Sequence, residues 1–89
     1  MFNVSKDLLK IGSISHYYSQ IGVALVELEE TLKIGDKITV MGSTTLFSQV
    51  VDSMQIQHKQ VNEAHKGDSI GLKIGSKARK GDQLFKIVE

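Results

Sequence analysis

The sequence predicts an all-β protein that folds as a single small closed antiparallel β-barrel of about six strands. Its apolar stretches are short, and Gly, Asp, Asn and Ser separate them, while proline is absent. Short strands with turn residues between them are typical of all-β domains. One sheet of this size gains from closing on itself, because closure removes exposed strand edges. The 89 residues leave room for one domain, residues 1–89, with 1–7 predicted as a disordered lead-in.

The first half of the chain predicts a hairpin and a third strand. We expect strands over residues 8–18 and 22–28, joined by the link 19–21, which is short enough for a hairpin turn. The next strand covers 37–41, and the polar residues 42–45 form the turn after it.

The second half begins with a long strand over residues 46–58. Its apolar residues change phase between Val51 and Met54, which predicts a β-bulge. A polar connection, an alternating half-buried strand, a basic connection and a last strand follow at 59–66, 70–74, 75–81 and 83–88.

A Gly-Asp pair precedes three of these strands, at Gly35-Asp36, Gly67-Asp68 and Gly81-Asp82. Glycine accepts positive φ, and an Asp side chain can bond nearby backbone N–H groups, so each pair predicts a turn into a strand. A metal site built from the three Asp residues is the alternative, but the sequence has no oxygen-ligand loop pattern.

Composition excludes several function classes. The absence of cysteine excludes disulfides, thiolate metal sites and a cysteine nucleophile, and it fits a cytoplasmic protein. The longest strongly apolar run, 21–26, is too short for a membrane helix, and the first residues do not resemble a secretory signal. The net charge of +1 does not itself indicate nucleic-acid binding.

The sequence predicts no metal, no cofactor and no enzymatic activity. His16, His58 and His65 lack the spacing typical of zinc ligands. No serine lies in a nucleophile-elbow pattern, and no carboxylate pair is marked as acid and base. A small hydrolase or metal protein that uses the histidines is the weakest of three interpretations.

His16, Tyr17 and Tyr18 form the first candidate binding segment. Adjacent residues of a strand point to opposite faces, so at most one tyrosine belongs to the core. The other would be exposed and could stack on a base. The alternative is a tyrosine that covers an end of the barrel.

Lys73, Lys77, Arg79 and Lys80 form the second candidate. Residues 77–80 contain no acidic residue, so this segment could contact phosphates in a salt-sensitive manner. The alternative is a solvated loop that aids solubility.

The order of these features resembles the second domain of translational GTPases such as elongation factors Tu and G, a reductase-isomerase-elongation factor barrel. The resemblance runs from about Leu8 to the end of the chain. Its most recognisable part comprises Gly67, Asp68, Gly71 and Leu72. Gly71 is predicted to be a turn residue, like the glycines of the Gly-Asp pairs. The matching segments are 12–28, 32–38, 51–56, 64–72 and 79–84. The same barrel is appended to some collagenase-like peptidases that act in RNA modification.

The phosphate loop of translational GTPases is missing from this sequence, and Gly75-Ser76-Lys77 only superficially resembles it. GTP binding by this chain is therefore not expected. The resemblance implies a non-enzymatic module that contacts RNA, the ribosome or a translation-related protein. The second interpretation is an accessory protein-interaction domain, equivalent to the barrel of the peptidase-like enzymes.

Overall fold

The computed structural model describes residues 7–88, which form ten β-strands, so the all-β antiparallel class is confirmed. The predicted lead-in lies outside the described residues except for Asp7, which begins the first strand. Nowhere in this range does a helix offer the length and apolar character needed to cross a membrane. The strands are β1 (Asp7–Tyr18), β2 (Val23–Leu28), β3 (Leu32–Lys33), β4 (Lys37–Met41), β5 (Leu46–Val50), β6 (Met54–Ile56), β7 (Lys59–Val61), β8 (Glu63–Ala64), β9 (Ser69–Lys73) and β10 (Gln83–Val88).

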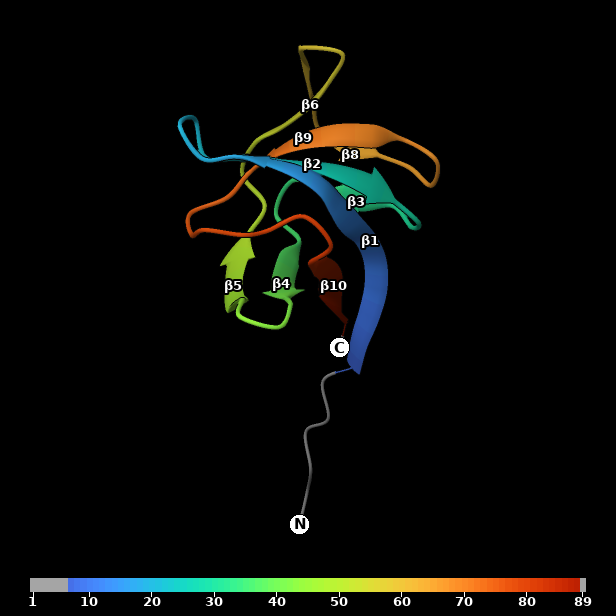
Figure 1. Cartoon of the computed structure of the whole chain (residues 1–89). Helices are drawn as coiled ribbons and strands as arrows, with labels where there is room; N and C mark the ends of the chain where they lie inside the picture. Colours follow the sequence, from blue (N-terminus) through green and yellow to red (C-terminus); the bar gives the residue numbers. More distant parts are fainter. Residues whose placement is uncertain (1–6, 89) are drawn as a thin grey trace.

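Eight strands form one sheet in the order β5-β4-β10-β1-β2-β9-β6-β7, and β3 pairs with β8 in a small second sheet. The long, curved β1 lies between β10 and β2 (Figure 1). Its register shifts between Lys10 and Gly12 against β10, and between Ile14 and His16 against β2. Such irregularities bend a strand and turn its side chains, which allows the sheet to curl around a core.

The predicted closure of the barrel by strand pairing is not found among residues 7–88, where β5 and β7 are the edges of an open sheet. A side chain spans the gap between β5 and β9 instead. The Gln49 amide donates to the Lys73 carbonyl at 3.0 Å and accepts from the Gly75 N–H at 2.8 Å. We call this contact the Gln49 seam. Between β5 and the end of β9, two hydrogen bonds of one amide side chain therefore stand where paired strands would form a series of backbone hydrogen bonds.

The long strand predicted over 46–58 is broken at residues 51–53, which separate β5 from β6. The Val51 N–H donates to the Asp36 carbonyl, and the Val51 carbonyl accepts from Gly35, each at 2.8 Å. Both Val51 and Met54 are buried. The change of phase seen in the sequence is therefore a break in the strand, because Val51 bonds the Gly35-Asp36 turn before β4 instead of a neighbouring strand.

Two further predictions need correction. The polar segment 59–66 contains β7 and β8, which are too short and too polar to give an alternating pattern. Gly71 is not a turn residue, because it lies in the middle of β9 and pairs with Leu25 on one side and Gln55 on the other. These short strands and the divided β5–β6 segment raise the number of strands from the predicted six to ten.

The three Gly-Asp turns have one common geometry, which is the geometry that the sequence pattern predicts. Gly35, Gly67 and Gly81 have φ values of 97°, 92° and 93°. In each turn, the Asp carboxylate accepts the N–H of the residue three positions earlier, at 2.8–2.9 Å. The Asp N–H in turn donates to the carbonyl of that same residue. Each turn is thus closed by one side chain and one backbone bond.

The core consists of apolar side chains from both halves of the large sheet and from the small second sheet. They form one cluster, against which Tyr17, Phe47, Ile56 and Val61 are packed. Burial removes this apolar surface from water and supplies most of the stabilisation of the fold. The members are Ile11, Ile14, Ala24, Val26, Leu28, Leu32, Ile38, Val40, Val51, Met54, Ala64, Ile70, Leu72, Ile74, Ala78 and Leu84.

Candidate groove on the outer face of the sheet

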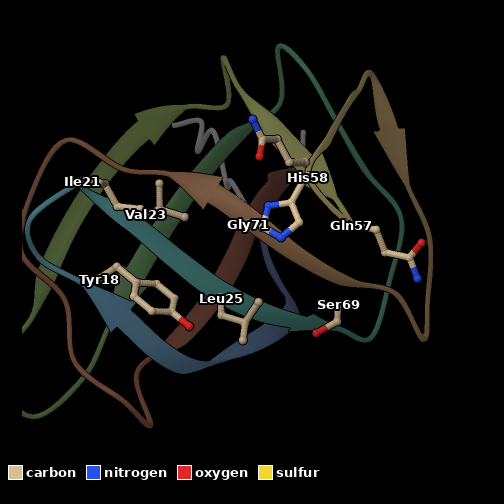
Figure 2. Close-up of a pocket in the computed structure, with 9 residues that line it drawn as sticks. Tyr18, Ile21, Val23, Leu25, Gln57, His58, Ser69 and Gly71 are labelled. Carbon is tan, nitrogen blue, oxygen red and sulfur yellow. The ribbon is translucent and has the colours of Figure 1, made fainter.

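A groove of about 520 Å³ lies on the face of the sheet that points away from the core (Figure 2). None of its lining residues is an acid, a lysine or an arginine. The groove therefore offers an apolar surface with a few neutral hydrogen-bonding groups. Its lining comprises Tyr18, Ile21, Val23, Leu25, Gln55, Gln57, His58, Ser69 and Gly71.

Strand alternation explains why these residues share one face. In β2, Ala24 and Val26 are buried, whereas Val23 and Leu25 between them are only partly covered and face outward. Gly71 in β9 is opposite Leu25, and a Cβ atom added to it would lie 3.5 Å from Cγ1 of Val23. A glycine at this position keeps the floor of the groove free of a side chain.

The irregularity at Ser15 turns His16 and Tyr18 of β1 outward. Ile14 pairs with Val26 and faces the core, but His16 pairs with Leu25, so Ser15 is an extra residue. Without it, His16 and Tyr18 would share the inward phase of Ile14. Ser15 secures this geometry by donating its hydroxyl to the Leu25 carbonyl at 3.2 Å.

The two tyrosines occupy opposite sides of the sheet. Tyr17 is packed against the core cluster, and Tyr18 is 46% exposed and lines the groove. His16 lies beside Tyr18, with ring centroids 4.3 Å apart and the planes tilted by 57°. Of the predicted aromatic candidates, the structure thus brings His16 and Tyr18 together and places Tyr17 elsewhere.

None of the predicted basic residues lines the groove, and of the four it is Lys73 that a hydrogen bond ties to a groove residue. Lys73 ends β9, and its Nζ donates to the Ile21 carbonyl at 3.0 Å, which holds it against the first hairpin turn. Lys77, Arg79 and Lys80 are exposed in the connection from β9 to β10. The ion pairs between described residues join Lys10 to Glu29, Lys86 to Asp36 and His65 to Glu63, and involve none of these three.

The three histidines are not gathered into a site. His16 lies in β1, His58 lies in the β6–β7 turn, and His65 pairs with Glu63 at 3.4 Å beside β8. Among residues 7–88, no group of three or more His, Asp or Glu side chains is placed to hold a metal ion.

Most residues of the groove carry no signal in the sequence. Gln55, Gln57 and Ser69 are polar residues in short or edge strands and turns, where nothing in the sequence distinguishes them from ordinary surface residues. Val23 and Leu25 lie in the apolar run 21–26, which shows no alternation that would separate an inner from an outer face. The alternation with Ala24 and Val26 becomes visible only once the sheet is known.

Comparison with known proteins relates the chain to one part of larger proteins. It is 42% identical over 82 residues to a protease of Methanocaldococcus jannaschii, covering 91% of this chain and 20% of the protease. It is 32% identical over 84 residues to a collagenase of Porphyromonas gingivalis, covering 92% of the chain and 20% of the collagenase. The chain thus spans about a fifth of the length of the curated relatives it matches. No family model matches it.

Solved structures give the same relationship at the level of the fold. The C-terminal domain of a Geobacillus thermoleovorans protein described as a U32 peptidase superposes with a TM-score of 0.80 at 19% identity, covering 85% of this chain and 89% of that domain. Its selenomethionine variant gives a TM-score of 0.79 at 18% identity, covering 84% and 95%. The chain is therefore a small domain homologous to a part of these proteases and collagenases, with the fold of a U32 peptidase C-terminal domain. The resemblance to translation elongation factors stays a prediction.

Proposed function

We propose that this chain is a non-catalytic accessory domain of the kind attached to U32-type peptidases, and that it contacts single-stranded RNA. The observation that carries the proposal is an exposed tyrosine in an uncharged groove, next to the start of a basic segment. The relatives support the accessory role, because the homologous segment is only about a fifth of each larger protein.

The composition of the groove suits an uncharged, flat group such as a base. Tyr18 offers an exposed ring, and Ile21, Val23 and Leu25 add apolar surface. Stacking on an aromatic ring contributes about 1–3 kcal/mol per base and tolerates any base, because every base has a π-face. A phosphate would gain little in this groove, since its lining carries neither lysine nor arginine.

The basic segment suits the backbone of the same strand. Lys73 lies at the rim of the groove through its bond to Ile21, and the chain continues from it to Lys77, Arg79 and Lys80. Contacts between such side chains and phosphates release counterions, so the resulting affinity falls as salt rises.

The geometry around Ser69 supports a non-catalytic role. Its hydroxyl donates to the Glu27 carboxylate at 2.6 Å, and the Ser15 hydroxyl, which donates to the Leu25 carbonyl, lies 3.4 Å from the same carboxylate oxygen. A nucleophilic serine needs a base, usually histidine, that accepts its proton. Among the described residues no histidine bonds Ser69, and its Glu27 partner also lies beside Ser15, so this cluster ties β1, β2 and β9 together.

Fluorescence anisotropy with a labelled single-stranded RNA oligomer tests the proposal. We expect Tyr18→Ala to weaken binding about 5- to 150-fold through loss of stacking. Changing Lys77, Arg79 and Lys80 together to Ala should lower the slope of log affinity against log salt by about 0.7 for each lost phosphate contact. Tyr17→Phe and Lys37→Ala are the matched controls and should bind as the wild type does.

The proposal fails if the wild-type domain does not bind the oligomer at low salt, or if the control variants weaken binding as much as the groove and basic variants. Binding of a protein in the groove, blocked by Tyr18→Ala in the absence of RNA binding, would assign the domain to protein interaction instead.

A further inference from the structure

The turn between β6 and β7 adopts an unusual backbone conformation. Ile56 pairs with Lys59, so the hairpin turn consists of only Gln57 and His58. Both residues have positive φ, at 51° and 66°, and residues 7–88 contain no other non-glycine residues with positive φ. Positive φ at both positions is typical of a type I′ turn, which strongly favours Asn-Gly, because glycine has no Cβ and Asn tolerates the left-handed region better than Gln or His.

Both residues of this turn line the groove, together with Gln55 of β6. Figure 2 shows the His58 ring on the side of the hairpin that faces β9 and Tyr18. The hairpin is joined to the sheet by only two residue pairs, Met54 with Leu72 and Gln55 with Gly71, and its tip extends beyond the neighbouring strands (Figure 1). The turn therefore places the Gln57 amide and the His58 imidazole along the groove, on a hairpin whose base is packed against the core through Met54, Ile56 and Val61.

We infer that Gln57 and His58 are specificity-determining residues, which discriminate between the bases of the bound RNA; this inference rests on the proposed function. Disfavoured backbone conformations persist where the side chains they present are useful, and they concentrate at binding sites. An Asn-Gly turn would form the same hairpin with less strain but would remove the longer amide and the imidazole from the groove.

Tyr18 on one side of the groove and the β6–β7 turn on the other contribute differently to the recognition of a base. The ring of Tyr18 stacks on any base, so it contributes affinity without selectivity. An amide and an imidazole both donate and accept hydrogen bonds, and bases differ from one another in the donors and acceptors along their edges. Gln57 and His58 therefore select between bases, whereas Tyr18 strengthens the binding of every base.

The double change Gln57→Asn with His58→Gly tests this division. Binding is measured against short homopolymers of adenosine, cytidine and uridine, and heat stability is followed by circular dichroism. The wild type is expected to prefer one homopolymer at least severalfold. The variant should lose that preference while its Tm rises by several degrees, because relief of strain stabilises the turn.

Two controls separate this effect from general damage. Gln60→Ala changes a hairpin residue that does not line the groove and should keep the preference. Tyr18→Ala should weaken all three homopolymers by similar factors. If RNA binds and the double variant keeps the wild-type preference, or if the wild type has no preference, the inference is wrong and the proposed function stands. If no homopolymer binds to the wild type, both are wrong.

Discussion

The three Gly-Asp turns share one hydrogen-bond pattern but differ in how far their Asp side chains are exposed to solvent. At Asp36 and Asp68 the bond to the preceding N–H is exposed, whereas at Asp82 it is partly buried. Asp82 is only 5% exposed, and its carboxylate lies against Gly42, where no side chain would fit. Water can replace a lost bond at the exposed turns, but it cannot do so as easily at Asp82.

We therefore expect Asp82→Ala to destabilise the fold more than Asp68→Ala. Both bonds are accepted by a carboxylate, and such bonds contribute about 1.5–3 kcal/mol. We expect Asp82→Ala to lose an amount in this range and Asp68→Ala to lose less, because water reaches the exposed N–H of its turn. Urea unfolding followed by far-ultraviolet circular dichroism measures both. Asp82→Asn, which keeps a side-chain oxygen as acceptor, should lie between Asp82→Ala and the wild type. Equal losses for Asp82→Ala and Asp68→Ala would contradict the role of burial.

At the scale of elements, β1 shows what the sequence could and could not predict. Its extent and the exposure of one tyrosine follow from composition and alternation, and both are found. The extra residue at Ser15 is not visible in the sequence, because a one-residue irregularity depends on the partner strand as much as on β1 itself. That irregularity decides which tyrosine faces the groove, so the sequence left Tyr17 and Tyr18 as equal candidates.

The contribution of the Gln49 seam to the contact between β5 and β9 can be tested by removing its side chain. Gln49→Ala removes two hydrogen bonds, to the Lys73 carbonyl and from the Gly75 N–H. Because both bonds are exposed and water replaces part of each, we expect a loss of about 0.5–1.5 kcal/mol in the free energy of unfolding. The Gly75 amide should also exchange with solvent faster, because its acceptor is gone.

Amide hydrogen exchange measured by NMR, together with thermal unfolding, checks this prediction. Gln60→Ala is the control, since it removes one exposed bond from the Gln60 amide to the Ser53 hydroxyl at 3.3 Å. Its effect should stay below that of Gln49→Ala and should not reach Gly75. An unchanged exchange rate at Gly75 in the Gln49→Ala variant would mean that backbone geometry alone holds β5 and β9 together.

At the scale of the molecule, the strand regions and turns were more predictable than the site. Apolar alternation reports which face of a strand is buried, and Gly-Asp pairs report local turns, so both can be read from neighbouring residues. The groove combines β1, β2, β9 and the β6–β7 turn, which meet only through the order of strands in the sheet. The same dependence on long-range pairing explains why closure was predicted and an open sheet with the Gln49 seam is found.

The open sheet raises the question of whether its two halves unfold together. Residues from β4, β10, β1, β2 and β9 all contribute to one buried cluster, and this continuity predicts a single cooperative transition. Leu84 is fully buried in β10, between β4 and β1. Leu84→Ala should therefore cost about 2–5 kcal/mol. Leu46→Ala, at a residue that is 76% exposed on the edge strand β5, should change stability by about 0.5 kcal/mol or less.

Urea unfolding of both variants, followed in parallel by circular dichroism and by tyrosine fluorescence, measures these values. Tyr17 is packed against the core and Tyr18 lies on the outer face, so fluorescence reports on the β1–β2 side while circular dichroism reports on all strands. The two curves should coincide in the wild type and in Leu84→Ala. If they separate, the β5-β4-β10 side unfolds independently of the groove, and the seam and the shared core do not join the halves into one cooperative unit.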